Sequence, residues 1–89
     1  MSFVVYIIRN AQSELYTGMT ANLLERLNSH NSNQVVTTRG RGPWEVVITE
    51  KCDSRMLARN REKYWKSAAG RRRRRAILDN QELPFEYRG

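Results

Sequence analysis

The stretch from Leu15 to His30 reads LYTGMTANLLERLNSH and joins a short strand pattern to a helix pattern. Tyr16 lies in the strand part, and Gly18 breaks the strand before the helix begins. Arg26 and His30 are four residues apart, so their side chains project from one face of that helix. A strand tyrosine, an arginine and a histidine can therefore converge on one point.

The start of this helix is marked by its own capping residues. Asn22 is followed three residues later by Glu25, which is the spacing of a capping box. We expect the helix to run from about Ala21 to Ser29. Three leucines form the apolar stripe that would hold the helix against the domain, Leu23, Leu24 and Leu27. The polar face is then left free for function.

Size and charge limit the possible classes of protein. The chain has 89 residues, enough for one domain that buries about 60% of the surface its unfolded form exposes. Sixteen Lys and Arg against nine Asp and Glu give a formal charge of +7, which favours a polyanionic partner, nucleic acid first. No long apolar run, lipidation signal or signal-peptide pattern favours a membrane. The single cysteine, Cys52, excludes an internal disulfide and indicates a reducing, cytoplasmic location.

Three segments have the composition of strands. The run Phe3–Ile8 has almost no polar alternation, which predicts a central strand covered on both faces. Glu14–Thr17 is expected to return beside it as a hairpin, so that Tyr6 and Tyr16 face each other. Trp44–Glu50 is the third strand.

A basic, glycine-containing loop, residues 35–43, precedes the third strand. It carries Arg39 and Arg41 and could lie along a phosphate backbone, or it could be an ordinary solvated loop.

A second helix is expected from a cap at Asp53 or Ser54 to about Ala68. Glu62 interrupts its stripe of small and apolar residues and needs a partner. The spacing favours a salt bridge with one of the nearby basic residues, and a divalent cation is the other possibility. These basic residues are Arg59, Arg61, Lys63 and Lys66.

The last part of the chain is dominated by arginine. We expect a basic helical segment over residues 70–78, followed by a loosely packed tail over 79–89. Contact with nucleic-acid phosphates would relieve the repulsion among these side chains, although a solubility tail or a localisation signal also has this composition. The five consecutive arginines are Arg71, Arg72, Arg73, Arg74 and Arg75.

The polar residues whose expected positions bring them close together suit phosphodiester hydrolysis. That reaction needs a proton acceptor for water, a cation beside the developing phosphorane charge and often a metal. Tyrosine is a weak base at its ordinary pKa near 10, so a cation or a metal would have to assist it. The set consists of Tyr6, Tyr16, Arg26, His30 and Glu62.

The order of these residues resembles the GIY-YIG nuclease domain, and more closely its small standalone members, which are relatives of the catalytic domains of excision-repair and structure-specific endonucleases. The resemblance covers roughly residues 3–77. It rests on Val5-Tyr6-Ile7, Tyr16-Thr17-Gly18, Arg26 ten residues after the second tyrosine, His30, the 38–44 segment, and Arg61-Glu62-Lys63 before Lys66. The chain departs from the family pattern in lacking the first glycine and in carrying the arginine run where many members have an asparagine.

The resemblance implies an α+β domain, residues 1–78, with a three-stranded antiparallel sheet flanked by helices. It also implies a site on the sheet surface with one divalent cation, Mg²⁺ or Mn²⁺, bound by Glu62. Tyr6 and Tyr16 would position or deprotonate the attacking water, with Tyr16 preferred as the base. Arg26 would stabilise the transition state and His30 would assist proton movement.

The expected function is metal-dependent endonucleolytic cleavage of DNA in repair or processing, selective for DNA structure, with RNA as another possible substrate. So small a chain would need a partner protein or a dimer for sequence specificity. A non-catalytic nucleic-acid-binding module and a ribosome- or chromatin-associated protein are the alternatives, but a carboxylate at Glu62 would repel phosphate in a pure binder. The expected nucleic-acid contacts are Arg39, Arg41, Lys66 and the five arginines.

Overall fold

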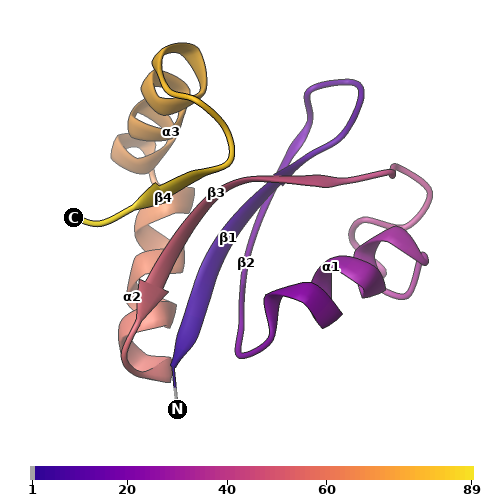
Figure 1. The fold of residues 1–89 in the computed structure, drawn as a ribbon, viewed down its shortest axis with the longest axis horizontal. Helices are drawn as coiled ribbons and strands as arrows, with labels where there is room; N and C mark the ends of the chain where they lie inside the picture. Colours follow the sequence, from indigo (N-terminus) through magenta and orange to yellow (C-terminus); the bar gives the residue numbers. More distant parts are fainter. Residues whose placement is uncertain (1) are drawn as a thin grey trace.

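The computed structural model describes residues 2–89, and Met1, where the predicted domain begins, lies outside the described residues. The chain forms an α+β fold in which a sheet separates one helix from two others (Figure 1). The elements in chain order are β1 (Phe3–Arg9), β2 (Leu15–Thr20), α1 (Leu23–Asn31), β3 (Glu45–Cys52), α2 (Arg55–Lys66), α3 (Ala68–Asn80) and β4 (Phe85–Tyr87).

The sheet has the strand order β2-β1-β3-β4, so the apolar strand β1 is central, as predicted. β1 pairs antiparallel with both β2 and β3, whereas β4 pairs in parallel with β3. The expectation of a three-stranded antiparallel sheet was therefore wrong, because the sheet is mixed and has four strands. The fourth strand lies within residues 79–89, which were expected to form a tail, and Tyr87 packs its ring at 90° to that of Trp65.

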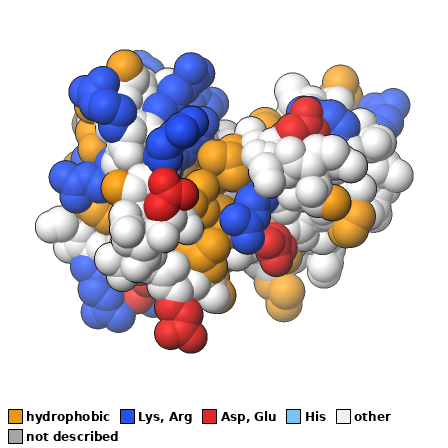
Figure 2. All heavy atoms as spheres, turned by 90° about the horizontal axis from the view of Figure 1, so that it is seen from above, with side chains coloured by type: hydrophobic (Ala, Val, Ile, Leu, Met, Phe, Trp, Pro, Cys, Tyr) orange, Lys and Arg blue, Asp and Glu red, His pale blue; other side chains and the backbone are white. Residues whose placement is uncertain are grey.

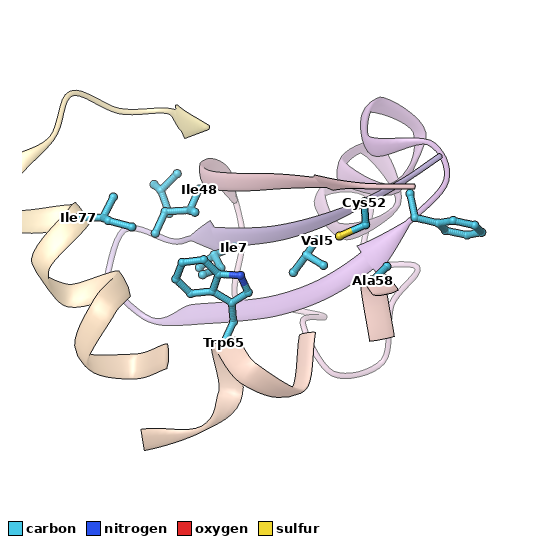
Figure 3. Close-up of a cluster of buried hydrophobic side chains, with 9 residues drawn as sticks. Val5, Ile7, Ile48, Cys52, Ala58, Trp65 and Ile77 are labelled. Carbon is cyan, nitrogen blue, oxygen red and sulfur yellow. The ribbon is translucent and has the colours of Figure 1, made fainter. Parts of the chain in front are cut away.

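The two faces of β1 bury different sets of side chains, because successive residues of a strand point to opposite sides. On one face, Val5 and Ile7 pack against α2 and α3, and Trp65 of α2 is 1% exposed there (Figure 3). On the other face, Tyr6 and Ile8 pack against α1 and the indole of Trp44. The face that is covered by α1 therefore carries Tyr6, one of the two tyrosines expected in the site.

Serine and asparagine caps define the helices. Oδ1 of Asn22 accepts a hydrogen bond from the amide of Glu25 at 3.1 Å, which confirms the predicted cap of α1. Ser54 caps α2, but α2 ends at Lys66 and not near Ala68, because Ser67 starts α3 there. A Cβ atom on Gly70 would lie 2.0 Å from the Tyr64 carbonyl oxygen, so the close junction of α2 and α3 requires glycine.

Candidate active site

A chain of buried hydrogen bonds joins the sheet, α1 and the long loop before β3. Nε2 of His30 lies 2.8 Å from the Tyr6 hydroxyl, and Nδ1 of the same ring lies 2.7 Å from Oγ1 of Thr38. His30 is completely inaccessible and Tyr6 is 1% exposed. The Thr38 hydroxyl also lies within 3.4 Å of the Val35 carbonyl oxygen, to which it donates.

The direction of donation along this chain follows from the single hydroxyl proton of Thr38. When that proton goes to the Val35 carbonyl, Thr38 Oγ1 accepts from Nδ1–H of His30 and Nε2 keeps a lone pair for the Tyr6 hydroxyl; when it goes to Nδ1, Nε2–H donates to the Tyr6 oxygen instead. Burial, assisted by the nearby Arg26 guanidinium, lowers the pKa of His30 below its ordinary 6.5. The imidazole is therefore neutral at pH 7, and in the Nδ1–H tautomer its Nε2 is a proton acceptor in contact with Tyr6.

The two charged residues of the predicted site, Arg26 and Glu62, also affect the pKa of the Tyr6 hydroxyl. Burial raises the pKa of Tyr6, the Arg26 guanidinium opposes the rise, and the neighbouring Tyr16 and Glu62 add to it. The phenol is therefore protonated at neutral pH, and it can ionise only if its proton has somewhere to go. Electrostatically, Arg26 and Glu62 belong to the surroundings of Tyr6 although they come from helices on opposite faces of the sheet.

Gly18 makes room for the tyrosine ring. It pairs with Tyr6 in the register of β1 and β2. A Cβ atom at this position would lie 2.5 Å from the Tyr6 hydroxyl oxygen and 2.7 Å from Cζ, closer than real Cβ contacts allow. The Tyr6 side chain therefore lies directly over the glycine of the edge strand.

Tyr16 lies beside Tyr6 and is only partly buried. The strand register pairs Tyr16 with Ile8, so the two tyrosines are diagonal neighbours and do not face each other directly as expected. Their ring centroids are 6.5 Å apart, and the centroid of Tyr16 lies 5.1 Å from that of His30. Both rings therefore reach the imidazole, but only Tyr6 is hydrogen-bonded to it in the part of the chain that the structure describes.

An open groove of about 660 Å³ at the end of β2 contains the other two predicted residues, Arg26 and Glu62. Oε2 of Glu62 lies 3.4 Å from Nζ of Lys66, so the salt bridge that the spacing favoured is present. The side chain of Lys66 is 54% exposed, so this pair contributes no more than about 1 kcal/mol. A cation could therefore replace Lys66 at the carboxylate with little loss.

The residues present supply few ligands for a divalent cation. Within residues 2–89, no three His, Cys, Asp or Glu side chains lie close enough together to hold a metal ion. Mg²⁺, however, commonly binds through one or two carboxylates, water and substrate phosphate oxygens. Glu62 therefore fits a cation that binds together with a phosphate, and it does not fit a tightly held resident ion.

The predicted nucleic-acid contacts are distributed unevenly around this groove. Lys66 lines it, and Arg39 is exposed on the long loop. Arg41 is engaged within the protein, since it pairs with Glu14 at 3.5 Å and lies 5.6 Å over the Trp44 ring. The five arginines are on α3, and four of them line a separate cavity described below.

Sequence reasoning missed two features of the site. Thr38 orients His30 from a loop eight residues away, and no local pattern in the sequence marks it. The groove also contains basic residues of α2 that share one helical face at spacings of three and four, a signal that the sequence does carry. They are Arg55, Arg59 and Lys63, together with the predicted Lys66.

The fold defines a class of small α+β domains in which two tyrosines and a histidine cluster on one face of the sheet, and an arginine and a glutamate line a groove at the end of its edge strand. Residues 2–75 match the family described as the GIY-YIG catalytic domain, and the chain belongs to this family. The predicted family is thereby confirmed.

Relatives of the chain are small proteins of similar length. It is 38% identical over 76 residues to a UPF0213 protein of Natronomonas pharaonis, covering 84% of this chain and 89% of that one. It is 41% identical over 63 residues to a UPF0213 protein of Clostridium perfringens, covering 70% and 68%. The solution structure of a UPF0213 protein from Bacillus halodurans matches with a TM-score of 0.54 and 30% identity, over 90% of this chain and 86% of that chain.

Across the described residues 2–89, none of the helices has both the length and the apolar character needed to span a bilayer.

Proposed function

We propose that the chain is a metal-dependent endonuclease that hydrolyses phosphodiester bonds in DNA. Membership of the GIY-YIG family supports a nuclease. The observation that carries the proposal is the buried hydrogen bond between Tyr6 and His30, beside a groove that contains Arg26 and Glu62. The proposal therefore joins a buried Tyr6–His30 pair to a guanidinium and a carboxylate that both influence the pKa of Tyr6.

The proposed reaction begins with a water molecule whose oxygen attacks the phosphorus atom while the bond to the leaving oxygen breaks. The leaving oxygen keeps the electron pair of that bond and takes a proton from solvent. The water proton passes to the Tyr6 oxygen as the Tyr6 proton passes to Nε2 of His30, which becomes an imidazolium. Arg26 stabilises the negative charge that develops on the phosphate oxygens. Mg²⁺ or Mn²⁺ held by Glu62 would supply further charge neutralisation at the phosphate.

Tyr6 takes the role of proton carrier in this proposal, and Tyr16 orients the water. The sequence favoured Tyr16 as the base, and its partial exposure is in keeping with that prediction. Tyr6, however, has the direct bond to a neutral imidazole, which compensates for a pKa raised by burial. Tyr6→Phe is expected to remove nearly all cleavage, and Tyr16→Phe is expected to leave a measurable rate.

The test is nicking of supercoiled plasmid by purified protein with Mg²⁺, Mn²⁺ or EDTA. Cleavage is expected to require the metal and to disappear in Glu62→Ala and Arg26→Ala, while salt-dependent DNA binding is largely retained. Glu82→Ala is the matched control, because Glu82 is exposed and lies outside the groove. Metal-independent nicking, or nicking that survives in Glu62→Ala, would contradict the proposal.

The rate should also depend on pH through His30. Because its pKa is lowered, the imidazole stays neutral down to a pH below 6.5, and the single-turnover rate is expected to fall only on the acid side of that value. His30→Gln should remove this acid limb along with most of the activity.

The same proposal includes selectivity for DNA structure and a role in repair or processing in the cytoplasm. It also includes a protein partner or a dimer that adds specificity. RNA is a second substrate, whose cleavage is to be compared with that of DNA. The alternative is a non-catalytic nucleic-acid-binding module. It is favoured by the charge of +7 and by the neutralisation of Glu62 by Lys66. A folded protein that shifts DNA in a gel but never cuts it would support this alternative.

A further inference from the structure

A second basic cavity lies away from the groove, between the β1–β2 hairpin and α3. Its volume is about 560 Å³. The hairpin contributes Arg9 and Leu15, and α3 contributes four of its arginines, Arg71, Arg72, Arg74 and Arg75. We call this cavity the arginine pocket. Figure 2 shows basic side chains gathered over the part of the molecule where α3 lies.

The arginines of α3 that line the pocket lack acidic partners. Among the described residues, 2–89, none of these four guanidinium groups lies within 4.0 Å of a carboxylate. Arg9 is different, because it pairs with Glu45 at 2.9 Å. Asp79 also lines the pocket but forms no such ion pair. Arg71 and Arg75 are one helical turn apart and repel each other, so an anion in the pocket would be stabilised.

One of the arginines is held in a fixed position. Arg74 is half-buried on the inner face of α3, between the buried Gly70 and Ile77. Its Nη1 donates to Oγ1 of Thr17 on β2 at 3.2 Å. Burial, together with the charge of Arg71, lowers the pKa of Arg74 from its ordinary value. A guanidinium that is partly desolvated and fixed in this way interacts more strongly with an anion than a mobile surface arginine does.

The pocket and the groove lie at opposite ends of the same edge strand. Leu15, at the start of β2, lines the arginine pocket, whereas Met19 and Thr20, at its end, line the groove. The contact between Arg74 and Thr17 lies between them. Five residue steps along a strand span about 17 Å. One stacked strand with the rise of B-form DNA advances the same distance along its axis in about five nucleotides.

We propose that the arginine pocket binds a backbone phosphate of the nucleic acid about five nucleotides from the phosphate held in the groove, so that the ligand lies along β2. This inference rests on the proposed function for its ligand. Guanidinium groups around one cavity suit the two free oxygens of a backbone phosphodiester, which share one negative charge. A second basic site at a distance that fits the spacing of nucleotides favours a nucleic acid over an acidic protein.

The test measures binding without cleavage, in EDTA, by fluorescence anisotropy with single-stranded oligonucleotides of three to ten nucleotides. Wild-type affinity is expected to rise steeply when the oligonucleotide becomes long enough to reach both sites, at about six phosphates. R71Q/R75Q is expected to lose this step, to bind a ten-nucleotide ligand about tenfold more weakly and to show a salt slope smaller by about 1.

The matched control is K51Q/R88Q, which removes the same charge from outside the pocket and the groove. Lys51 and Arg88 both pair with Glu86, at 3.6 Å and 2.7 Å. This variant is expected to keep the length step and to lose only the affinity due to general charge. R72Q/R75Q serves as a second pocket variant if the first unfolds, as judged by circular dichroism.

Three results would overturn the inference. They are equal losses in the pocket and control variants, a wild-type affinity that rises smoothly with length, and displacement of DNA by polyglutamate at equal charge concentration. A result that refutes the nuclease proposal can be distinguished from these three results. A wild-type protein that shows the length step but never nicks plasmid keeps the pocket as a binding site, whereas nicking without a length step refutes the pocket alone.

Discussion

Replacing Gly18 with alanine tests whether the position of Tyr6 is fixed. The new methyl group would lie 2.5 Å from the Tyr6 hydroxyl oxygen, 2.7 Å from Cζ and 3.1 Å from Cε1. The buried ring cannot move away without breaking its hydrogen bond to His30. Overpacking costs about 1–3 kcal/mol and the lost hydrogen bond about 1 kcal/mol, so we expect the free energy of unfolding to fall by about 3 kcal/mol.

Urea unfolding followed by tryptophan fluorescence measures this loss, which should lower the midpoint by about 2 M. Plasmid nicking should disappear as well. Tyr6→Phe removes the atom closest to the new methyl group, so Gly18→Ala should cost about 1 kcal/mol less in the Tyr6→Phe background. The control is Gly40→Ala, where a Cβ meets no heavy atom within 4 Å and only the positive φ of 78° opposes alanine. A Gly18→Ala protein as stable and active as the wild type would refute the fixed position of Tyr6.

Two further predictions concern stability. The pKa of His30 is lower in the folded than in the unfolded state, so the unfolded state binds more protons below pH 6.5 and the free energy of unfolding should fall with decreasing pH, by at most about 1.4 kcal/mol per pH unit. His30 is the one histidine of the chain, and urea midpoints from pH 7 to 5.5 that are as pH-dependent in His30→Gln as in the wild type would contradict this origin. Glu50→Ala should cost about 3 kcal/mol in urea unfolding, because Oε1 of Glu50 accepts from the Arg61 guanidinium and the Trp65 indole, both at 2.9 Å. A smaller loss than in Glu45→Ala, whose carboxylate is 65% exposed, would show that this cluster does not stabilise the fold.

The elements that the sequence predicted well are those specified by local chemistry. The continuous apolar run of β1 indicated a central strand, and Asn22 with Glu25 marked the start of α1 within two residues. The break between α2 and α3 was missed, because it depends on the close approach of Gly70 to the end of α2. β4 was missed because it has three residues and pairs in parallel with β3, across a connection that contains two helices.

The candidate site was predicted from residue types but not from their contacts. Chain order grouped Tyr6, Tyr16, His30 and the two charged residues, and the structure places all five around the end of β2 or the adjacent sheet face. The sequence could not show which tyrosine bonds to His30, since this depends on strand register and on the space above a glycine.

The hydrogen bonds of the site also hold the fold together, and this decides which variants can test the chemistry. Thr38 bonds to His30 through its side chain, and its carbonyl oxygen accepts from the indole of Trp44 at 3.4 Å. Truncating His30 to alanine would therefore open a cavity, release the loop and remove the proton acceptor at the same time. Tyr6→Phe and Thr38→Val preserve most of the volume and remove one hydroxyl each. Each variant is expected to lose about 1 kcal/mol of stability and to remain folded under assay conditions, so a much larger loss of rate would arise from proton transfer and not from unfolding.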